Sequence, residues 1–413
     1  MASKPVQKWA FKPSMRAGAY SWKSSTKAIE KLKSASSEIR AVARTDPTKA
    51  AEGVIALAQR IWPAFEHIDT SSGALGNAVA RTLEELLPIV IDALADEKDR
   101  AKWLEQLREA IMDDGVDYLA PIAQCFGQIA ACPSLMNLHA DRDLNMIEAA
   151  WSDHASFAHV TTGTLTLSCL LEAGRYDELL DLLQKKKTRL WFDERFGAEA
   201  LLRQGREDEA LAYAEALLQG DRQPWGYHDI SQFCEGILVA QGREEEAYRR
   251  FGLPSVSGNT YVAMWRDLVK RYPDLDARQI LEDLIDTKGQ KGKWFAAAKT
   301  AKYLDLALEC AAQPDAAPAT LTRAARDFTI KEPAFAVQVG LHAIGHLLAG
   351  RSYDPNPLDI DEAVVHIMAA SERIEKSGWA LQALKRLAAN AATDVIMSAR
   401  LKSRLADIER GHI

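Results

Sequence analysis

The sequence predicts an all-α fold: an irregular α-solenoid of stacked antiparallel helix pairs, with a helical N-terminal portion and a C-terminal helical cap. Three observations predict it. Apolar residues recur in steps of three and four along nearly the whole chain, which is the spacing of one face of an α-helix. No segment alternates apolar and polar residues as a half-buried strand does. Three segments near the middle share one glycine-centred pattern.

The N-terminal helices follow from periodicity and from capping residues. One apolar stripe runs over residues 75–94, and Pro88 within it predicts a kink or a break. Asp46 and Pro47 are typical of a helix N-cap followed by the first helical residue. A helix is therefore expected to begin at residue 47, and a second one near residue 75.

The glycine-centred segments predict helix pairs in the middle of the chain. Gly174, Gly205 and Gly242 are 31 and 37 residues apart, close to the roughly 34-residue period of tetratricopeptide repeats. Each glycine is followed by arginine and then by acidic residues. A helix can end at such a glycine in the left-handed conformation, and the acidic residues favour the start of the next helix. A weaker fourth copy covers residues 301–307.

These patterns divide the chain into four predicted regions. Residues 1–24 form a basic aromatic arm, residues 25–155 an N-terminal helical region, residues 156–312 the tetratricopeptide-like repeats and residues 313–413 a C-terminal helical region. The clearest loop within the last region covers residues 351–358, where aspartate and asparagine each precede a proline.

The charge is distributed unevenly. The chain carries a net charge of −7, but residues 1–50 hold eleven lysines and arginines against three acidic residues, a net charge of +8. A basic arm on an acidic body can attract nucleic acid or anionic lipid, or it can pack along its own acidic body. The aromatic residues of the arm favour packing: Trp9, Phe11, Tyr20 and Trp22.

No cofactor or metal site is predicted. The five cysteines are scattered, and none lies in a CxxC pair or at a zinc-like spacing to histidine. Free thiols of this kind indicate a reducing compartment. No apolar stretch reaches the roughly 18 residues of a membrane span, and the first residues lack the apolar core of a secretory signal. We therefore expect a cytoplasmic protein.

Catalytic constellations fail on context, so no catalytic residue is predicted. His342 and His346 are four residues apart on an expected helix, but the glutamate of an HExxH motif is missing and their neighbours are apolar. Packed or hydrogen-bonded histidines are therefore favoured over a zinc site. The residue types of a triad also occur together at His67, Asp69, Ser71 and Ser72. Asp69 or Ser72 as a helix N-cap explains them better, since no GxSxG turn follows a strand.

Four separated strings carry a resemblance to a known family. They cover residues 15–22 (MRAGAYSW), 43–53 (ARTDPTKAAEG), 69–79 (DTSSGALGNAV) and 292–299 (GKWFAAAK). In these strings the chain resembles a bacterial family of helical, tetratricopeptide-like proteins catalogued as a domain of unknown function. The resemblance implies a helical-repeat fold and a bacterial origin, and it implies no activity.

Two groups of residues are candidate binding sites. Trp225, Tyr227 and His228 stand at the start of a repeat's first helix and could anchor a protein partner, or they could be core between repeats. Five lysines without an intervening acidic residue could bind an anion or nucleic acid, or form a solvated helix rim: Lys288, Lys291, Lys293, Lys299 and Lys302.

The sequence thus favours a non-enzymatic scaffold that binds a protein partner through a groove. The alternative is a nucleic-acid-binding helical-repeat protein that uses the basic arm and the 288–302 lysines. Salt dependence separates the two, because nucleic-acid binding weakens steeply as salt displaces it from phosphates. The sequence does not predict an oligomeric state.

Overall fold

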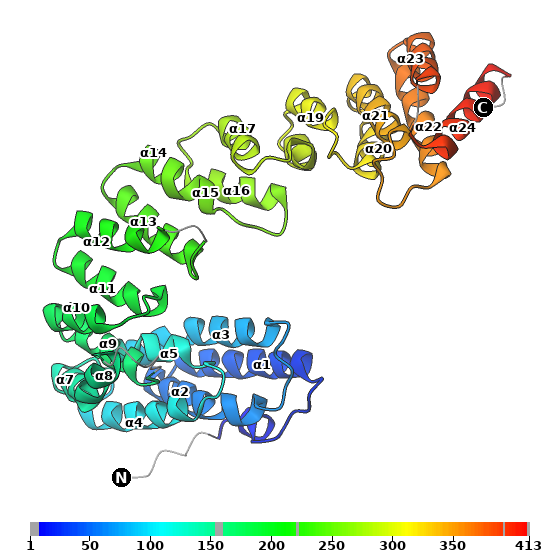
Figure 1. Cartoon of the computed structure of the whole chain (residues 1–413). Helices are drawn as coiled ribbons and strands as arrows, with labels where there is room; N and C mark the ends of the chain where they lie inside the picture. Colours follow the sequence, from blue (N-terminus) through cyan, green and yellow to red (C-terminus); the bar gives the residue numbers. More distant parts are fainter. Residues whose placement is uncertain (1–7, 153–159, 220–222, 391–392, 411–413) are drawn as a thin grey trace. The chain divides into compact units, whose positions relative to one another are not determined.

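The computed structural model describes residues 8–152, 160–219, 223–390 and 393–410. Within these ranges every regular element is a helix and none is a strand, so the all-α prediction is confirmed. Helices pack mainly against their neighbours in the chain, as stacked helix pairs require. The chain forms two compact units, Met1–Ile230 and Ser231–Ile413 (Figure 1). The finer division into four regions stays a prediction.

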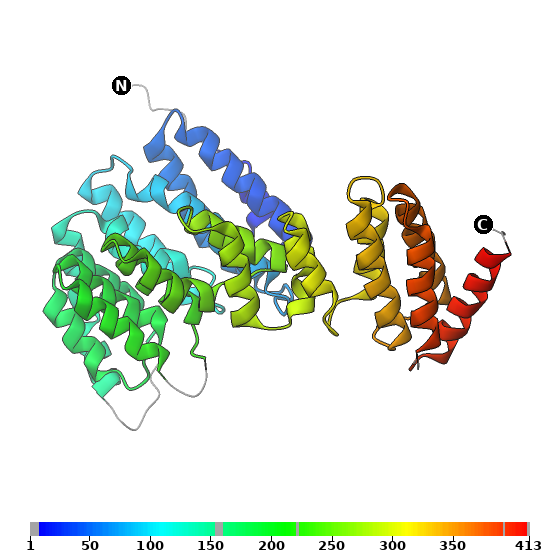
Figure 2. The ribbon, with the colours of Figure 1, turned by 90° about the horizontal axis from the view of Figure 1, so that it is seen from above.

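The first unit contains twelve of the labelled α-helices and two short 3₁₀ turns within its described residues. They are η1 (Lys12–Met15), α1 (Ser25–Ala43), α2 (Pro47–Phe65), α3 (Ala74–Ile91), α4 (Glu97–Asp113), α5 (Ala120–Gln124), α6 (Phe126–Ala130), α7 (Pro133–Arg142), α8 (Leu144–Ser152), α9 (Gly163–Glu172), α10 (Tyr176–Lys185), α11 (Trp191–Arg203), α12 (Glu207–Glu215) and η2 (Ala216–Leu218). Figure 2 shows the helices of this unit from above.

The second unit continues the pattern after α13 (Tyr227–Ala240), which begins in the first unit and ends in the second. Helix α14 passes into a single π-helical turn, η3, before α15. The elements are α14 (Glu244–Ala247), η3 (Tyr248–Gly252), α15 (Leu253–Ser255), α16 (Tyr261–Arg271), α17 (Ala277–Lys288), η4 (Lys291–Trp294), α18 (Phe295–Thr300), α19 (Leu304–Ala311), α20 (Pro318–Phe328), α21 (Pro333–Leu348), α22 (Pro357–Arg373), α23 (Ser377–Ala389) and α24 (Val395–Glu409).

The three repeat glycines end their helices as predicted. Gly174, Gly205 and Gly242 have φ angles of +73°, +71° and +71°, in the left-handed region. The amide of the following arginine donates to the carbonyl five residues earlier, at 3.0, 3.0 and 2.8 Å. This bond is the signature of a Schellman cap, and it satisfies a carbonyl that the helix end would otherwise leave without a partner.

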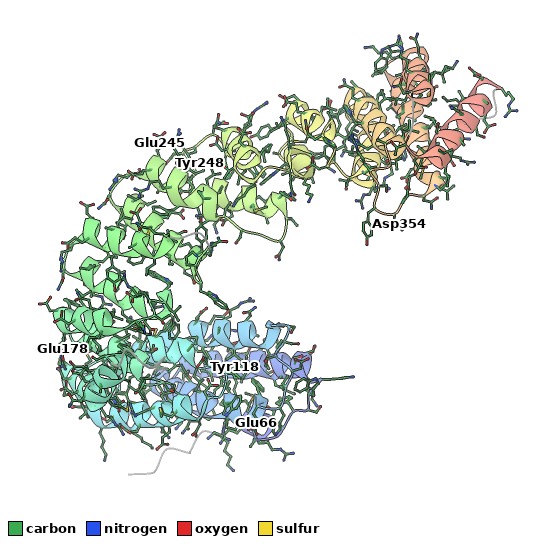
Figure 3. The ribbon with its side chains drawn as sticks, in the orientation of Figure 1. Glu66, Tyr118, Glu178, Glu245, Tyr248 and Asp354 are labelled. Atoms are coloured by element: carbon green, nitrogen blue, oxygen red, sulfur yellow. The ribbon has the colours of Figure 1, made fainter. Side chains whose placement is uncertain are left out.

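The arginine after each glycine also has a fixed partner. Its guanidinium pairs with the glutamate three residues on, at 2.7 Å for Glu178, 2.6 Å for Glu209 and 2.7 Å for Glu246. Glu178, labelled in Figure 3, lies on the outer edge of α10. The string Gly-Arg-x-x-Glu is therefore one structural unit that ends a helix and starts the next.

The same cap recurs where no glycine marks it. In the fourth copy Lys302 takes the glycine position with φ +66°, and the amide of Tyr303 donates to the carbonyl of Ala298 at 3.0 Å. At the end of α22, Glu375 has φ +55°, and the amide of Lys376 donates to the carbonyl of Ser371 at 2.9 Å. The geometry thus extends beyond the residues that the glycine pattern identified.

The N-terminal helices begin where the sequence places them. The Asp46 carboxylate accepts the Lys49 amide at 3.0 Å, and Pro47 is the first residue of α2. Helix α3, however, runs through Pro88 to Ile91 without a break. Its N-cap is Gly73, with φ +68°, instead of Asp69 or Ser72. The Ser72 hydroxyl accepts the Ala74 amide at 3.4 Å, a weak local contact.

The basic arm packs on its own unit from residue 8 onward. Trp9, Phe11 and Tyr20 are buried, so the packing interpretation is confirmed for these three aromatics. The Glu38 carboxylate of α1 accepts the amides of Ala10 and Phe11, at 2.7 and 3.1 Å. For Trp22 the packing interpretation is wrong, since that residue is 63 % exposed.

Two glycines of the N-terminal region, one in a helix and one in a loop, leave room for tryptophan rings. A Cβ atom on Gly53 of α2 would lie 2.4 Å from the Trp9 ring, and one on Gly115 would lie 2.6 Å from the Trp62 ring. Non-bonded carbon atoms do not approach so closely, so only glycine lets these rings rest on the backbone. The Trp9 ring of the arm therefore packs directly against the backbone of α2 at Gly53.

A buried arginine joins two helix ends in the same unit. Arg100 of α4 donates to the carbonyls of Val90, Ile91 and Ala93 at the end of α3, at 3.5, 3.1 and 2.5 Å. It also donates to the carbonyl of Ile129 in α6 at 2.6 Å. Burial lowers the pKa of Arg100. One side chain thus satisfies carbonyls that two helix C-termini leave without partners.

Candidate binding surfaces

An apolar surface lies at the start of α11 in the first unit. We call Leu190, Trp191, Phe192 and Trp225 the aromatic surface. Trp225 is 91 % exposed, and Leu190 and Phe192 are 41 % and 40 % exposed. Gly226 has φ +82°, and a Cβ there would lie 3.0 Å from the Cβ of Trp191, so the Trp225 segment rests against Trp191. Exposed large apolar groups on segments that lie side by side are typical of interaction sites.

The three residues that the sequence grouped, Trp225, Tyr227 and His228, differ in their exposure to solvent. Trp225 is not part of a core between repeats, since most of its surface faces solvent. Tyr227, the first residue of α13, is partly exposed, and His228 is exposed. The core interpretation is therefore excluded for Trp225, and this residue remains the strongest anchor candidate of the three.

The link before α11 is held by buried acids. Glu194 is fully buried, and its carboxylate accepts from Arg189 at 2.8 Å and from the Tyr213 hydroxyl. Lys186 pairs with Asp193, and burial lowers the pKa of Lys186. Burial, and then the Glu194 charge, raises the pKa of Tyr213. These contacts fix the backbone on which Leu190 and Phe192 stand.

The 288–302 lysines do not act as one group. The Lys288 ammonium donates to the Pro254 carbonyl at 2.7 Å, and burial lowers its pKa. Lys291 pairs with Glu309 at 2.7 Å, and this bond raises the pKa of Lys291. Lys293 and Lys302 are exposed, and Lys299 is partly exposed. Two of the five charges are thus directed at partners within the second unit.

One of the two paired histidines is held by hydrogen bonds. His346 is buried, and its Nε2 lies 2.8 Å from the Ala311 carbonyl. Its Nδ1 lies 3.1 Å from the Arg351 guanidinium. Burial lowers the pKa of both His342 and His346. The hydrogen-bonded interpretation is confirmed for His346, and no group of three or more metal-ligating side chains occurs among the described residues.

A hollow of about 500 Å³ in the second unit is balanced in charge. Arg326, His366, Glu372 and Arg373 line it together with the exposed Ile330. Nε2 of His366 lies 3.7 Å from the Glu362 carboxylate, and Arg326 lies 3.1 Å from Asp327. Cations and acids therefore neutralise one another around this hollow.

Comparison with known proteins adds little. The chain matches no protein-family model and no curated protein. One solved structure that matches is described as a circular tandem repeat protein with novel repeat topology and enhanced subunit contact surfaces. The two chains are 15 % identical, with 94 % of this chain and 90 % of that chain covered, and the TM-score is 0.16. A likeness at that level carries no argument about fold or function.

Sequence reasoning missed part of the aromatic surface. Leu190 and Phe192 flank Trp191 directly after the basic residues 185–189. A signal was present, because three consecutive large apolar residues at a helix start exceed what one buried face requires.

In the part of the chain that the structure describes, no helix has the length and apolar character of a membrane span.

Proposed function

We propose that this protein is a non-enzymatic helical-repeat scaffold that binds a protein partner at the aromatic surface. The observation that carries the proposal is Trp225, which is 91 % exposed on a backbone fixed by Gly226 against Trp191. A large ring kept in solvent on an ordered frame is what an interface anchor requires.

The repeats supply the frame. The aromatic surface stands at the starts of α11 and α13, which are the first helices of two consecutive Gly-Arg-x-x-Glu units. Stacked repeats present extended surfaces that suit helical or extended peptides. The resemblance to a bacterial helical-repeat family of unknown function is consistent with such a role, and we propose a bacterial origin on that basis.

The test compares two single variants, one at a tryptophan and one at a leucine. Trp225→Ala removes the anchor, whereas Leu94→Ala removes a side chain of the same unit that is 95 % exposed and lies outside the aromatic surface. Each purified chain is immobilised and exposed to extract from the cells of origin, at low and at high salt. A partner found in this way is then purified and titrated by calorimetry.

Wild type and Leu94→Ala should bind the purified partner equally, and Trp225→Ala should bind about 30-fold more weakly, as for a hot-spot residue of roughly 2 kcal/mol. Binding should persist at high salt, since an apolar anchor is not screened. Equal affinity of all three chains for every partner would exclude the aromatic surface as the binding site.

A further inference from the structure

A second surface of the first unit is rich in cations. We call it the cationic face: Lys8, Lys12, Arg16, Lys23, Lys27 and Lys31. All but Lys12 are exposed, and Lys12 is partly exposed. Residues 8–37 contain seven lysines and arginines and a single acidic residue, Glu30.

These cations lie on two segments that contact each other, the arm and α1. Lys27, Lys31 and Glu38 lie within roughly 40° of one another around α1, so they share one face of that helix. The arm reaches this face where Glu38 accepts the Ala10 and Phe11 amides. It then returns to the start of α1, since the Gly18 amide donates to the Pro63 carbonyl near the end of α2.

These cations differ from the basic residues that precede α11 and from Lys291. Lys185, Lys186 and Arg189 pair with Glu148, Asp193 and Glu194, and Lys291 pairs with Glu309. None of the six residues of the cationic face forms an ion pair with any residue that the structure describes. The Glu38 carboxylate, which faces the arm, accepts backbone amides of Ala10 and Phe11.

An exposed ring lies in the chain between the cations of the arm and those of α1. Trp22 precedes Lys23, and its side chain is 63 % exposed. Its backbone is fixed, because its carbonyl accepts the Asp69 amide at 3.0 Å. An accessible indole beside a line of cations is the combination that binds single-stranded nucleic acids, where cations contact phosphates and the ring stacks on a base.

We propose that the cationic face binds single-stranded nucleic acid, with Trp22 as a stacking platform. This site is separate from the aromatic surface and uses none of its residues. A duplex offers the same phosphates but keeps its bases stacked, so it leaves Trp22 without a partner. An anionic membrane would need a broad apolar area to bury, and Trp22 is the one large apolar side chain exposed among described residues 8–37.

The first experiment measures the phosphate contacts. Full-length protein is titrated against a fluorescein-labelled single-stranded oligouridylate by anisotropy over a series of salt concentrations. Six contacts predict that log K falls with log salt with a slope of about −4, at roughly 0.7 per neutralised phosphate. The triple variant Lys23→Ala, Lys27→Ala, Lys31→Ala should reduce the slope to about −2 and weaken binding at low salt at least tenfold.

A matched triple variant controls for charge. Lys293→Ala, Lys299→Ala, Lys302→Ala removes three cations from the second unit and should leave affinity and slope within twofold of wild type. Thermal melting of all variants verifies the fold. No binding of single strands at low salt, or equal losses in the two triple variants, would overturn the proposal.

The second experiment isolates stacking. Trp22→Ala should weaken oligouridylate binding about tenfold, in line with loss of one stacked base, and leave binding of inorganic polyphosphate unchanged. Trp22→Phe should recover most of the loss. Equal effects on both ligands would exclude stacking and overturn the proposal. So would binding to phosphatidylserine vesicles that depends on Trp22 while the oligonucleotide remains unbound.

Discussion

Two regions of this protein are held together by different kinds of contact. In the N-terminal region, single side chains connect distant segments: Trp9 rests on Gly53, and Arg100 joins the ends of α3 and α6. In the repeats, the end of the first helix of each pair is fixed within nine residues by a Gly-Arg-x-x-Glu unit. The first kind of contact concentrates stability in a few residues, whereas the second distributes it over many copies. Substitutions should therefore cost more in the N-terminal region.

The largest effect is expected for Arg100→Met. Methionine keeps the apolar stem but leaves the carbonyls of Val90, Ile91, Ala93 and Ile129 without their donor. We expect a loss of about 3 kcal/mol in the free energy of unfolding, because unsatisfied buried groups cost roughly 1–3 kcal/mol each and water replaces some of the bonds. Urea unfolding measures the loss, and hydrogen exchange by mass spectrometry locates it.

The amides at the ends of α3 and α6 should exchange faster in this variant, while those of α20–α22 should not change. Arg44→Met is the control, since Arg44 is exposed and follows α1 directly. If both variants unfold at the same urea concentration, Arg100 does not hold the two helix ends.

A smaller loss is expected for Gly53→Ala. The added methyl group would overlap the Trp9 ring, so the ring must leave its site and expose apolar surface. We expect a loss of about 2 kcal/mol, the order of burying one large side chain. Gly76→Ala is the matched control: Gly76 also lies in a helix, and a Cβ there would meet no atom within 4 Å. That variant should be slightly more stable than wild type, since alanine favours helix.

A double variant tests the mechanism. If Gly53→Ala acts by displacing the ring, adding it to Trp9→Ala should cause almost no further loss. Additive losses in the double variant would show that Gly53 is needed for a reason unrelated to Trp9.

The contrast between the regions also explains what could be predicted from the sequence. Helix periodicity, the Asp46-Pro47 start and the caps at Gly174, Gly205 and Gly242 follow from rules that act over a few residues. The role of Arg100 could not be predicted, because its acceptors are carbonyls, which every residue carries. The exposure of Trp22 could not be predicted either, since Trp9, Phe11 and Tyr20 in the same arm are buried.

The candidate sites also differ in whether nearby or distant residues determine them. Trp225 was identified from its position at a repeat start, which is a local property. Whether the 288–302 lysines have internal partners depends on Pro254 and Glu309, which come from other elements of the second unit. Charge runs alone do not show which cations already have partners.

In the repeats, Gly205→Ala should cause a loss of about 1 kcal/mol. Gly205 has φ +71°, a left-handed conformation that costs an L-residue roughly 1–2 kcal/mol. A Cβ there would meet no atom within 4 Å, so the loss would report backbone strain alone. Gly345→Ala in α21 is the control with equal space but helical backbone, and it should not destabilise. A loss near 3 kcal/mol would contradict the view that each repeat cap contributes a small, separate share.

The smallest effect has the opposite sign. Lys302 occupies the glycine position of the fourth copy with φ +66°, so the chain already carries left-handed strain there. Lys302→Gly should relieve this strain and raise the free energy of unfolding by about 0.5–1 kcal/mol. The gain is smaller than the full left-handed penalty, because glycine is also more flexible in the unfolded chain. Lys302→Ala should change little, because alanine meets the same strain as lysine. Urea unfolding of the two variants separates backbone strain from loss of charge: if both stabilise equally, the lysine charge rather than the cap geometry limits stability at this helix end.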